Sequence, residues 1–370
     1  MRKSFSLLVV GVSLICCTSF LTAAAFPFKN EPLFLIEQNG KFGYMDINGK
    51  VKIKPRFDDA HDFSEGRALV RKGEGGQTKF GYINTQGQVV VPIKYDYAMD
   101  YLEGKAAVVT YKGNDVIDTS YIDKSGKQLF SIGDFLSYGF TEGRAAVITN
   151  YIGFGKEKPR LGFIDTEGKF TVQPQYKYNF SDGMSYFQEG LAAVNKDEAY
   201  GFIGKNGNVK INYRFNTALQ FQEGLAAVED KNGKWGFIDT TGKYVIQPQF
   251  AEANSFHDGL APVMQEVNGE SLWGFINKEG RLVIPAEYTD AEPFAEGLAA
   301  IEVEAGYSGK WGFIDSQGKL VVKPQFDYAE PFHNGLASVQ INDGSDNYAN
   351  ASYRNGYINK QGKYVWKPSK

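Results

Sequence analysis

Cysteine and histidine are scarce in this chain of 370 residues, and each shortage restricts its chemistry. The two cysteines lie near the start, at Cys16 and Cys17, and there are three histidines, His61, His257 and His333. Beyond residue 17 the chain therefore has no disulfide, cysteine nucleophile or cysteine metal site. The histidines lie far apart and lack the spacing of zinc ligands, so we expect neither a metal nor another cofactor.

Long apolar segments are also missing, except at the N-terminus. Residues 1–25 begin with Arg2 and Lys3, continue through an apolar run and end in small residues, as secretory signal peptides do. The run is short for a membrane span and no second one follows, so we expect no transmembrane span after signal cleavage. The residues before Cys16 and Cys17 match a lipoprotein signal poorly. The sequence thus predicts an exported protein, whether periplasmic, cell-surface or secreted, and we do not expect lipid anchoring.

Neither sign of charge dominates. Without Arg2 and Lys3 the chain has 38 basic and 43 acidic residues, and no long run of like charge stands out. Nucleic-acid binding usually needs a basic surface, so we expect no nucleic acid as a partner. A zinc-type histidine pair, a phosphate-binding glycine loop and a nucleophile elbow are all missing from the sequence. These absences favour a protein that is not an enzyme.

What the chain has in abundance is glycine, aromatic residues and repetition. It contains 42 glycines, and 15% of its residues are aromatic, a composition that favours short strands joined by turns. The segment KWGFID at 234–239 recurs at 310–315, and LWGFIN lies between them at 272–277. Aligned on the glycine of this motif, nine copies about 38 residues apart fill residues 26–370. A fixed period of this length is the signature of a repeat array.

Each copy predicts three strands, which we name a, b and c. Strand a is a run such as GLAAV, strand b is WGFID, and strand c is a run such as KYVIQPQF. In the first copy Val51, Ile53 and Phe57 face one side of strand c while Lys52 and Lys54 face the other, which predicts one buried face. The turn between b and c starts with Asp or Asn and contains a glycine, as hairpins often do. Because Asn replaces the acid in several copies, we expect turn capping rather than acid–base chemistry at this position.

The first two positions of the WGFID motif have a structural interpretation. A glycine weakens a strand unless something uses the missing side chain, so its recurrence predicts close approach of a neighbouring strand or ring. Other copies have Phe, Tyr or Leu in place of the tryptophan, which favours packing over a ladder of rings that stack on a ligand. The residues to which we assign this structural role are Trp235, Gly236, Trp273, Gly274, Trp311 and Gly312.

The recurring pattern KWGFID..GK.VI.P.F resembles the WG-repeat, or KWG-repeat, family of bacterial exported proteins. The resemblance covers roughly residues 33–368, and it implies a repetitive β protein without implying any enzymatic activity. The aromatic hairpins are also somewhat similar to choline-binding cell-wall repeats. That second likeness keeps open the alternative of a module that binds cell-wall polymers or glycans through its aromatic repeat positions.

The predicted fold is therefore all-β, a tandem array of nine three-stranded units. One unit is too small to bury a core alone and must pack on its neighbours. Each unit is complete, from strand a near Leu33–Glu37 to strand c near Lys363–Lys367, which favours an open β-solenoid or superhelical stack. A closed β-propeller is the alternative. The predicted domains are a signal peptide, 1–25, and a WG-repeat β domain, 26–370.

Function is expected where the copies differ, which is in the loops between strands a and b. Such loops suit polar recognition, so the first hypothesis is a scaffold that binds a protein or peptide through them. The identity of the partner and the oligomeric state stay open. The most variable loops are 71–78, 150–160, 265–271, 302–309 and 341–354. The candidate contact residues in them are Tyr151, Phe154, Lys156, Arg160, Tyr307, Asn347, Tyr348 and Tyr353.

Overall fold

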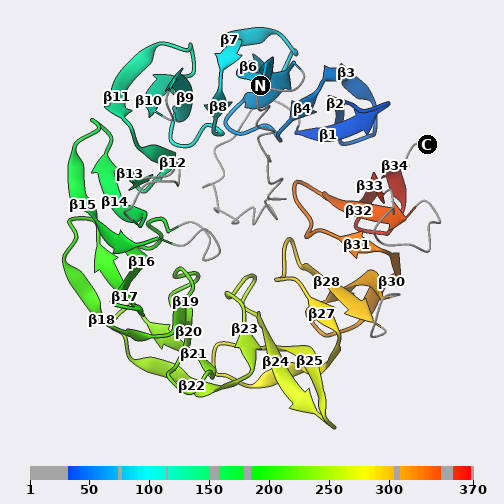
Figure 1. Ribbon diagram of the computed structural model, residues 1–370. Coiled ribbons are helices and arrows are strands. Elements are labelled where there is room, and N and C mark those ends of the chain that lie inside the picture. Colours follow the sequence, from blue (N-terminus) through cyan, green and yellow to red (C-terminus); the bar gives the residue numbers. More distant parts are fainter. Residues whose placement is uncertain are drawn as a thin grey trace, which may run out of the picture. The chain divides into compact units, whose positions relative to one another are not determined.

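The computed structural model shows a succession of antiparallel β-sheets. All the elements it defines are strands, and within the compact unit Pro32–Lys370 they follow one another in chain order (Figure 1). In the part of the chain that is described, no helix is long and apolar enough to cross a membrane. The predicted signal peptide lies outside that part. The described residues are 32–73, 77–113, 116–149, 158–178, 185–303, 309–342 and 353–367.

Strand a is apolar on both faces because a neighbouring sheet covers each of them. Ala226 belongs to a buried cluster with Phe202 of the preceding sheet, whereas Ala227 belongs to a cluster with Phe256 of the following one. This explains why the predicted GLAAV run does not alternate. The a strands are β1 (Leu33–Gln38), β5 (Arg67–Lys72), β9 (Lys105–Gly113), β13 (Arg144–Ile148), β16 (Leu191–Lys196), β20 (Leu225–Glu229), β24 (Ala261–Val267), β28 (Leu298–Val303) and β32 (Leu336–Asn342).

Strand b carries the WGFID motif and lies between strands a and c. In the sixth unit Gly236 lies opposite Val228 of strand a, and Phe237 lies opposite both Ala227 and Ile246. Phe237 is completely buried. The b strands are β2 (Lys41–Asp46), β6 (Lys79–Asn84), β10 (Val116–Asp123), β14 (Arg160–Asp165), β17 (Ala199–Gly204), β21 (Trp235–Asp239), β25 (Glu270–Ile276), β29 (Lys310–Asp315) and β33 (Tyr353–Asn359).

Strand c forms the outer edge of a typical sheet and has the predicted alternation. Ile53 and Phe57 are buried while Lys52 and Lys54 are exposed, so the expected buried face is confirmed. Proline in this strand is tolerated at an edge, where no further strand needs its missing donor. The c strands are β3 (Val51–Phe57), β7 (Val89–Tyr95), β11 (Gln128–Gly133), β15 (Phe170–Lys177), β18 (Val209–Phe215), β22 (Tyr244–Phe250), β26 (Leu282–Tyr288), β30 (Leu320–Phe326) and β34 (Tyr364–Trp366).

A fourth strand corrects the expected three-stranded unit. Six sheets have four strands, because a two-residue strand in the link before strand a pairs with that strand. Two residues are too few to show a periodic pattern, so the sequence analysis missed them. In the fourth unit a longer strand, β12 (Leu136–Thr141), takes this place. The short strands are β4 (Asp59–Ala60), β8 (Tyr97–Ala98), β19 (Thr217–Ala218), β23 (Glu252–Ala253), β27 (Asp290–Ala291) and β31 (Tyr328–Ala329).

The motif glycine marks a bulge between strands b and c. Trp235 pairs with Phe250 and Phe237 with Ile246, so two residues of strand b span four of strand c. A Cβ atom on Gly236 would lie 2.6 Å from the Ile246 carbonyl oxygen and 2.7 Å from the Pro248 nitrogen. The predicted close approach of a neighbouring strand is therefore confirmed.

The turn between strands b and c is capped as predicted. One carboxylate oxygen of Asp239 accepts hydrogen bonds from the amides of Thr241 and Lys243, at 2.9 and 3.0 Å. The amide oxygen of Asn359 accepts the equivalent two bonds. Because a neutral residue does the same work, this position is a turn cap rather than an acid–base group.

Aromatic pairs join each unit to the next. Phe237 of strand b meets Phe256, which lies in the link of the following unit, with ring centroids 4.9 Å apart. Equivalent contacts recur along the chain, including Tyr44 with Phe63 and Phe313 with Phe332. The expectation that the link covers the core between units is thus confirmed.

Candidate functional site

The first and last described sheets lie against each other, and the candidate site is at their junction. Phe34 and Ile36 of β1 and Met45 of β2 share a buried cluster with Leu336 of β32. The rings of Phe34 and Tyr357 meet edge to face at 5.7 Å. This junction therefore brings together residues more than 300 positions apart.

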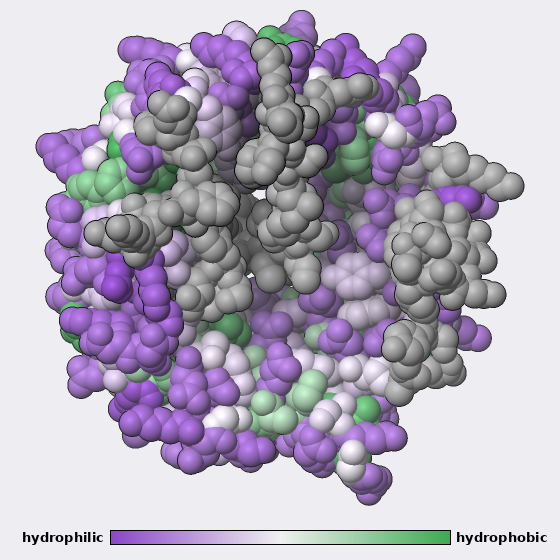
Figure 2. Space-filling model, viewed as in Figure 1, coloured by the Kyte–Doolittle hydropathy of each residue, from purple (hydrophilic) through white to green (hydrophobic). Residues whose placement is uncertain are grey.

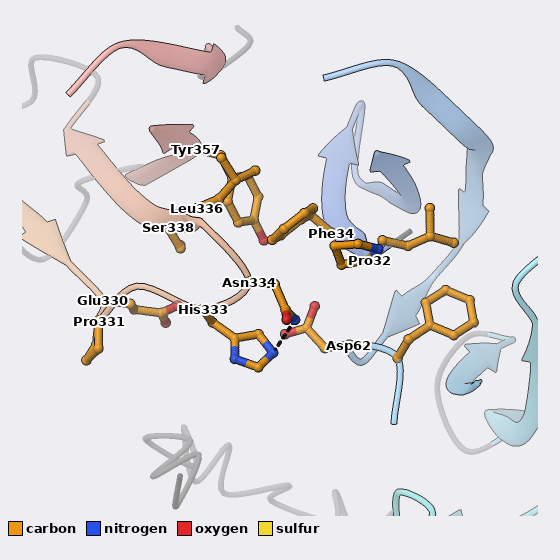
Figure 3. A pocket seen from close by; sticks show the side chains of 12 residues that line it. Pro32, Phe34, Asp62, Glu330, Pro331, His333, Asn334, Leu336, Ser338 and Tyr357 are labelled. Carbon is orange, nitrogen blue, oxygen red and sulfur yellow. Dashed lines mark hydrogen bonds between the residues drawn. The ribbon is translucent and has the colours of Figure 1, made fainter. Parts of the chain in front are cut away.

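A pocket of about 110 Å³ opens beside this contact (Figure 3). Phe34 of β1 and Tyr357 of β33 line one part of it, and Ser338 of β32 lies nearby. The links after β4 and β31 supply the charged groups Asp62 and Glu330. The volume compares with cavities that hold a small ring or a few waters, so the pocket can accept a side chain or a short stretch of backbone.

The pocket has an acidic character. Desolvation by the surrounding protein raises the pKa of the Asp62 carboxyl, and the charge of Asp100 raises it further, while His333 acts in the opposite direction. Desolvation likewise raises the pKa of Glu330, and Asp62 adds to the effect. Since the charge of Asp62 disfavours charge on Glu330, a cation close to both carboxylates would favour their charged forms.

His333 lies at the edge of the pocket and has a neighbour of its own. Its Nε2 is 2.8 Å from the side-chain nitrogen of Asn334, an interaction drawn in Figure 3. The expected absence of a histidine metal site stays a prediction. Within the described ranges, no group of three His, Cys, Asp or Glu side chains is arranged to hold a metal ion.

The repeated acids before strand a have a structural task. Glu223 is in the left-handed region, with φ of 53°, and Gly224 follows with φ of 86°. The Glu223 carboxylate accepts a hydrogen bond from the amide of Gly259 in the next unit, at 3.2 Å, and meets the Lys278 ammonium at 3.1 Å. The same acid-to-glycine contact recurs in Glu65–Gly104, Glu103–Gly143, Glu142–Gly190, Glu189–Gly224, Asp258–Gly297 and Glu296–Gly335.

Most loop residues proposed from the sequence fall outside the described residues. Arg160 is the exception, because it is exposed at the start of β14 and its backbone amide bonds to the Thr149 hydroxyl at 3.1 Å. Tyr353 begins β33, but its side chain is not described. The loop hypothesis stays a prediction. The residues outside the described ranges are Tyr151, Phe154, Lys156, Tyr307, Asn347 and Tyr348.

The tryptophans of the motif lie partly or fully inside the protein. Trp273 and Trp311 are buried, with 8% and 4% of their surface exposed, and Trp235 is partly buried. Trp311 packs edge to face on Tyr328 at 5.2 Å. Since Trp273 and Trp311 are buried, they offer little ring surface on which a sugar could stack.

The exposed large apolar side chains of the described residues are dispersed along the chain. Where it is coloured, the face in Figure 2 is largely hydrophilic, with apolar residues scattered between polar ones. Most of the large apolar side chains exposed among the described residues lie near the starts of c strands, for example Val245 and Leu320, whereas Tyr111 lies in β9. Scattered apolar residues of this kind are normal on a protein surface.

The pocket residues were not predicted from the sequence, although one signal was present. Phe34 stands at a position of strand a where the other units have alanine, as in Ala68 and Ala226. Aligning the LFLI of the first unit with the RALV of the second would have revealed it. The contact with Tyr357 could not be found in this way, because it depends on how the first and last sheets meet.

Comparison with protein families gives one match. The model of the "WG containing repeat" matches seven segments, at residues 42–75, 80–112, 162–198, 200–235, 235–266, 273–307 and 311–344. These segments cover well over half of the chain. The comparison with curated proteins gives no match.

Several solved structures are similar in outline. A computationally designed protein, Ika8, aligns with 84% of this chain and 96% of its own, at 10% identity and a TM-score of 0.44. The β-propeller domain of the Trilobed protease from Pyrococcus furiosus aligns over 85% and 100%, at 10% identity and 0.44. BamB from Moraxella catarrhalis aligns over 83% and 90%, at 12% identity and 0.41. Likenesses this distant carry no argument about function.

Proposed function

Because this chain belongs to the family of proteins built from WG-containing repeats, we propose that it is an exported, non-enzymatic scaffold that binds a protein or peptide. The observation that carries the proposal is the pocket between the first and last sheets. It is lined by polar and charged groups from four separate elements or links, as in Figure 3. The pocket is smaller than the roughly 300 Å³ or more of a typical small-molecule site, so it suits one side chain of a larger partner better than a whole small molecule.

We further infer that the nine units expected from the sequence close into a ring, as in a β-propeller. An open stack would keep its two ends apart. The contact between Phe34 and Tyr357, and the burial of Met45 together with Leu336, instead favour closure. The contact between the first and last sheets would then differ from every contact between consecutive units. This difference supports placing the function there.

A scaffold role fits the repeated carboxylates better than catalysis does. Each repeated acid that precedes a turn glycine accepts a hydrogen bond from a backbone amide of the next unit, as Glu223 does from Gly259. A carboxylate used in this way holds two units together. Catalysis would instead need one distinct group of acids with a free face toward a substrate.

A selection experiment tests the proposed function. A random peptide library displayed on phage is selected on the immobilised full chain, and enriched peptides are measured by calorimetry. We expect Ser338→Arg, which places a long charged side chain in the pocket, to abolish binding. Ser316→Arg makes the same charge change on an exposed turn and should leave binding unchanged.

Two further variants separate the pocket from the loops. Residues 150–157 and 343–352 are each replaced by Gly-Ser linkers of equal length. If these replacements abolish binding and Ser338→Arg does not, the site lies on the loops and the pocket assignment is wrong. If the selection enriches no peptide and an array of exported proteins shows no binder, the scaffold proposal itself fails.

A further inference from the structure

We propose that the pocket takes an extended peptide with a basic residue, which adds an inner strand to β1. The inference rests on the proposed binding function and names the class of ligand. It comes from the repeat itself. In most other units the two-residue strand before strand a, together with the residue that follows it, pairs with strand a. We call these three residues the inner segment. The inner segment makes three contacts, and we expect a peptide bound beside β1 to make an equivalent of each.

The first contact is a backbone hydrogen bond to strand a. The amide of His61, directly after β4, donates to the carbonyl of Leu69 in β5 at 2.9 Å. Asn254 donates in the same way to Pro262, and Glu330 to Ser338. Leu35 is the residue of β1 that corresponds to Leu69, since Leu35 lies opposite Tyr44 and Leu69 opposite Tyr82.

In β1 this carbonyl lies on the edge with which no described strand pairs. Among the described strands β1 pairs only with β2, in the sheet β1-β2-β3. The Leu35 backbone amide lowers the pKa of the Asp62 carboxyl, so it lies close to this pocket residue. Addition of a strand to an open edge is a common mode of peptide recognition. We therefore expect the peptide to donate a backbone N–H to the carbonyl of Leu35.

The second contact comes from a tyrosine of the preceding unit. Tyr44 donates its hydroxyl to the carbonyl of His61 at 2.7 Å, and Tyr82 donates to Met99 at 2.6 Å. Tyr357 is the equivalent residue of the last unit, two positions before the turn-capping Asn359. Its hydroxyl has no hydrogen-bond partner among the described residues. The same peptide residue that donates to Leu35 can accept from Tyr357.

The third contact selects the side chain. In the second unit the ring of His61 reaches the Asp100 carboxylate of the next link, with Nδ1 and Oδ2 3.1 Å apart. In the first unit the peptide residue takes the place of His61, and Asp62 takes the place of Asp100. The side chain of that peptide residue should therefore face Asp62. Glu330 lies on the other side of the same pocket. Two carboxylates call for a cationic side chain, and lysine or arginine supplies it.

Phe34 explains why the peptide need not carry an aromatic ring. In other units a ring from the link packs on the strand b aromatic, as Phe63 does on Tyr44 at 4.8 Å. Phe34 packs on Tyr357 at 5.7 Å and occupies part of that place. The remaining space is bounded by Asp62 and Glu330, so backbone and a basic side chain fit it better than a second ring.

The probe is a capped pentapeptide, Asn-Thr-Ala-Lys-Gln. It copies residues 216–220 of the chain, which contain the inner segment of their own unit, with lysine in place of Leu219. Binding to the full-length chain is measured by fluorescence anisotropy of a labelled peptide. We expect the unaltered sequence with leucine to bind about 10-fold more weakly, because it lacks the charge-assisted contact. Methylation of the lysine backbone nitrogen should weaken binding about 10-fold, because it removes the donor to Leu35.

Matched variants of the protein locate the site. Tyr357→Phe keeps the ring and removes the donor, so binding should weaken about 3- to 10-fold. Tyr44→Phe makes the same change at a junction that already has its inner segment and should leave binding unaltered. Asp62→Asn should remove the preference for lysine over leucine.

Several outcomes would overturn the inference. The methylated probe could bind as tightly as the unmethylated one, or Tyr357→Phe could bind the probe as tightly as the unaltered protein. A photo-crosslinkable probe could react away from Phe34 and Tyr357. An experimental structure could also show the pocket filled by the chain's own residues. If the phage selection yields binders while this probe does not bind, the scaffold function stands and only the ligand class is wrong.

Discussion

At the scale of single residues, the motif glycine has the most demanding environment. A Cβ on Gly236 would lie within 2.7 Å of two backbone atoms of strand c, and backbone cannot move aside as a side chain can. We therefore expect Gly236→Ala to lower the free energy of unfolding by about 3 kcal/mol, the upper range for overpacking. Chemical denaturation monitored by tryptophan fluorescence would measure it.

Gly224→Ala is the matched control. Gly224 has φ of 86°, but a Cβ there meets nothing within 4 Å. Its substitution should cost only the left-handed backbone penalty, about 1 to 2 kcal/mol. If the two alanine variants were equally stable, close approach would not be the reason for the motif glycine.

Two histidines should titrate in a predictable order. Burial opposes the charged form of His61, but its hydrogen bond to Asp100 and the charges of Asp100, Asp59 and Asp62 outweigh this and raise its pKa above 6.5. Burial is the larger effect at His257 and lowers its pKa below 6.5, although Glu223 and Asp258 act in the opposite direction. In an NMR titration of the ring protons, His257 should therefore lose its proton at a lower pH than His61.

The raised pKa of His61 also gives the sign of a stability effect. A raised folded-state pKa means that the charged form stabilises the fold at pH values below 6.5, and that this contribution is lost as pH rises through the folded-state pKa. Asp100→Asn should bring the His61 titration down toward 6.5. If Asp100→Asn left the His61 titration unchanged, the pair at 3.1 Å would not be its cause.

At the scale of elements, alternate units form an ion pair between a lysine in the turn after strand b and the repeated acid of the preceding unit. Lys124, Lys205, Lys278 and Lys360 each reach the acid of the preceding unit, at 3.0 to 3.2 Å. The intervening units have Thr166, Thr240 or Ser316 at the same place in the turn. The acid-to-glycine bond recurs in both kinds of unit, so the lysine supplements a contact that forms without it.

This alternation predicts a stabilising substitution. Thr240→Lys should bring an ammonium to Glu189 as Lys278 comes to Glu223. The gain should be small, about 0.3 to 1 kcal/mol, because such pairs are partly exposed, and it should shrink in high salt. Thr241→Lys, one position on, would instead lose the Thr241 hydroxyl bond to Asp239 and should not stabilise. Thermal unfolding at low and high salt would compare the two.

The b and c strands and their turns could be predicted from the sequence because their signals are local. The alternation in Val51–Phe57 and the Asp or Asn at the turn depend on neighbours within a few positions. The two-residue strands could not be predicted, because Asp59–Ala60 is a strand only through its pairing with Val70 and Arg71. The identity of such a segment is set by tertiary context.

The candidate site was even less accessible to sequence reasoning. Its pocket needs Phe34 and Tyr357 to meet, and these belong to opposite ends of the repeat array. A repeat pattern states what each unit offers to the next but does not state whether the last unit meets the first. Binding through the loops, which the sequence favoured because they vary, stays a prediction.

At the scale of the whole molecule, ring closure can be measured in solution. A compact chain of this size has a radius of gyration of about 20 Å. Nine repeat units stacked in the open at about 10 Å each would extend about 90 Å, which corresponds to a radius of gyration above about 25 Å. We expect small-angle scattering of residues 26–370 to give a value near the compact limit, because Phe34 and Tyr357 join the first and last sheets. Phe34→Asp places a charge in that contact and should expand the molecule, whereas Phe80→Asp, at a partly buried position within the array, should not separate the ends. A radius above about 25 Å for the unaltered chain would contradict closure.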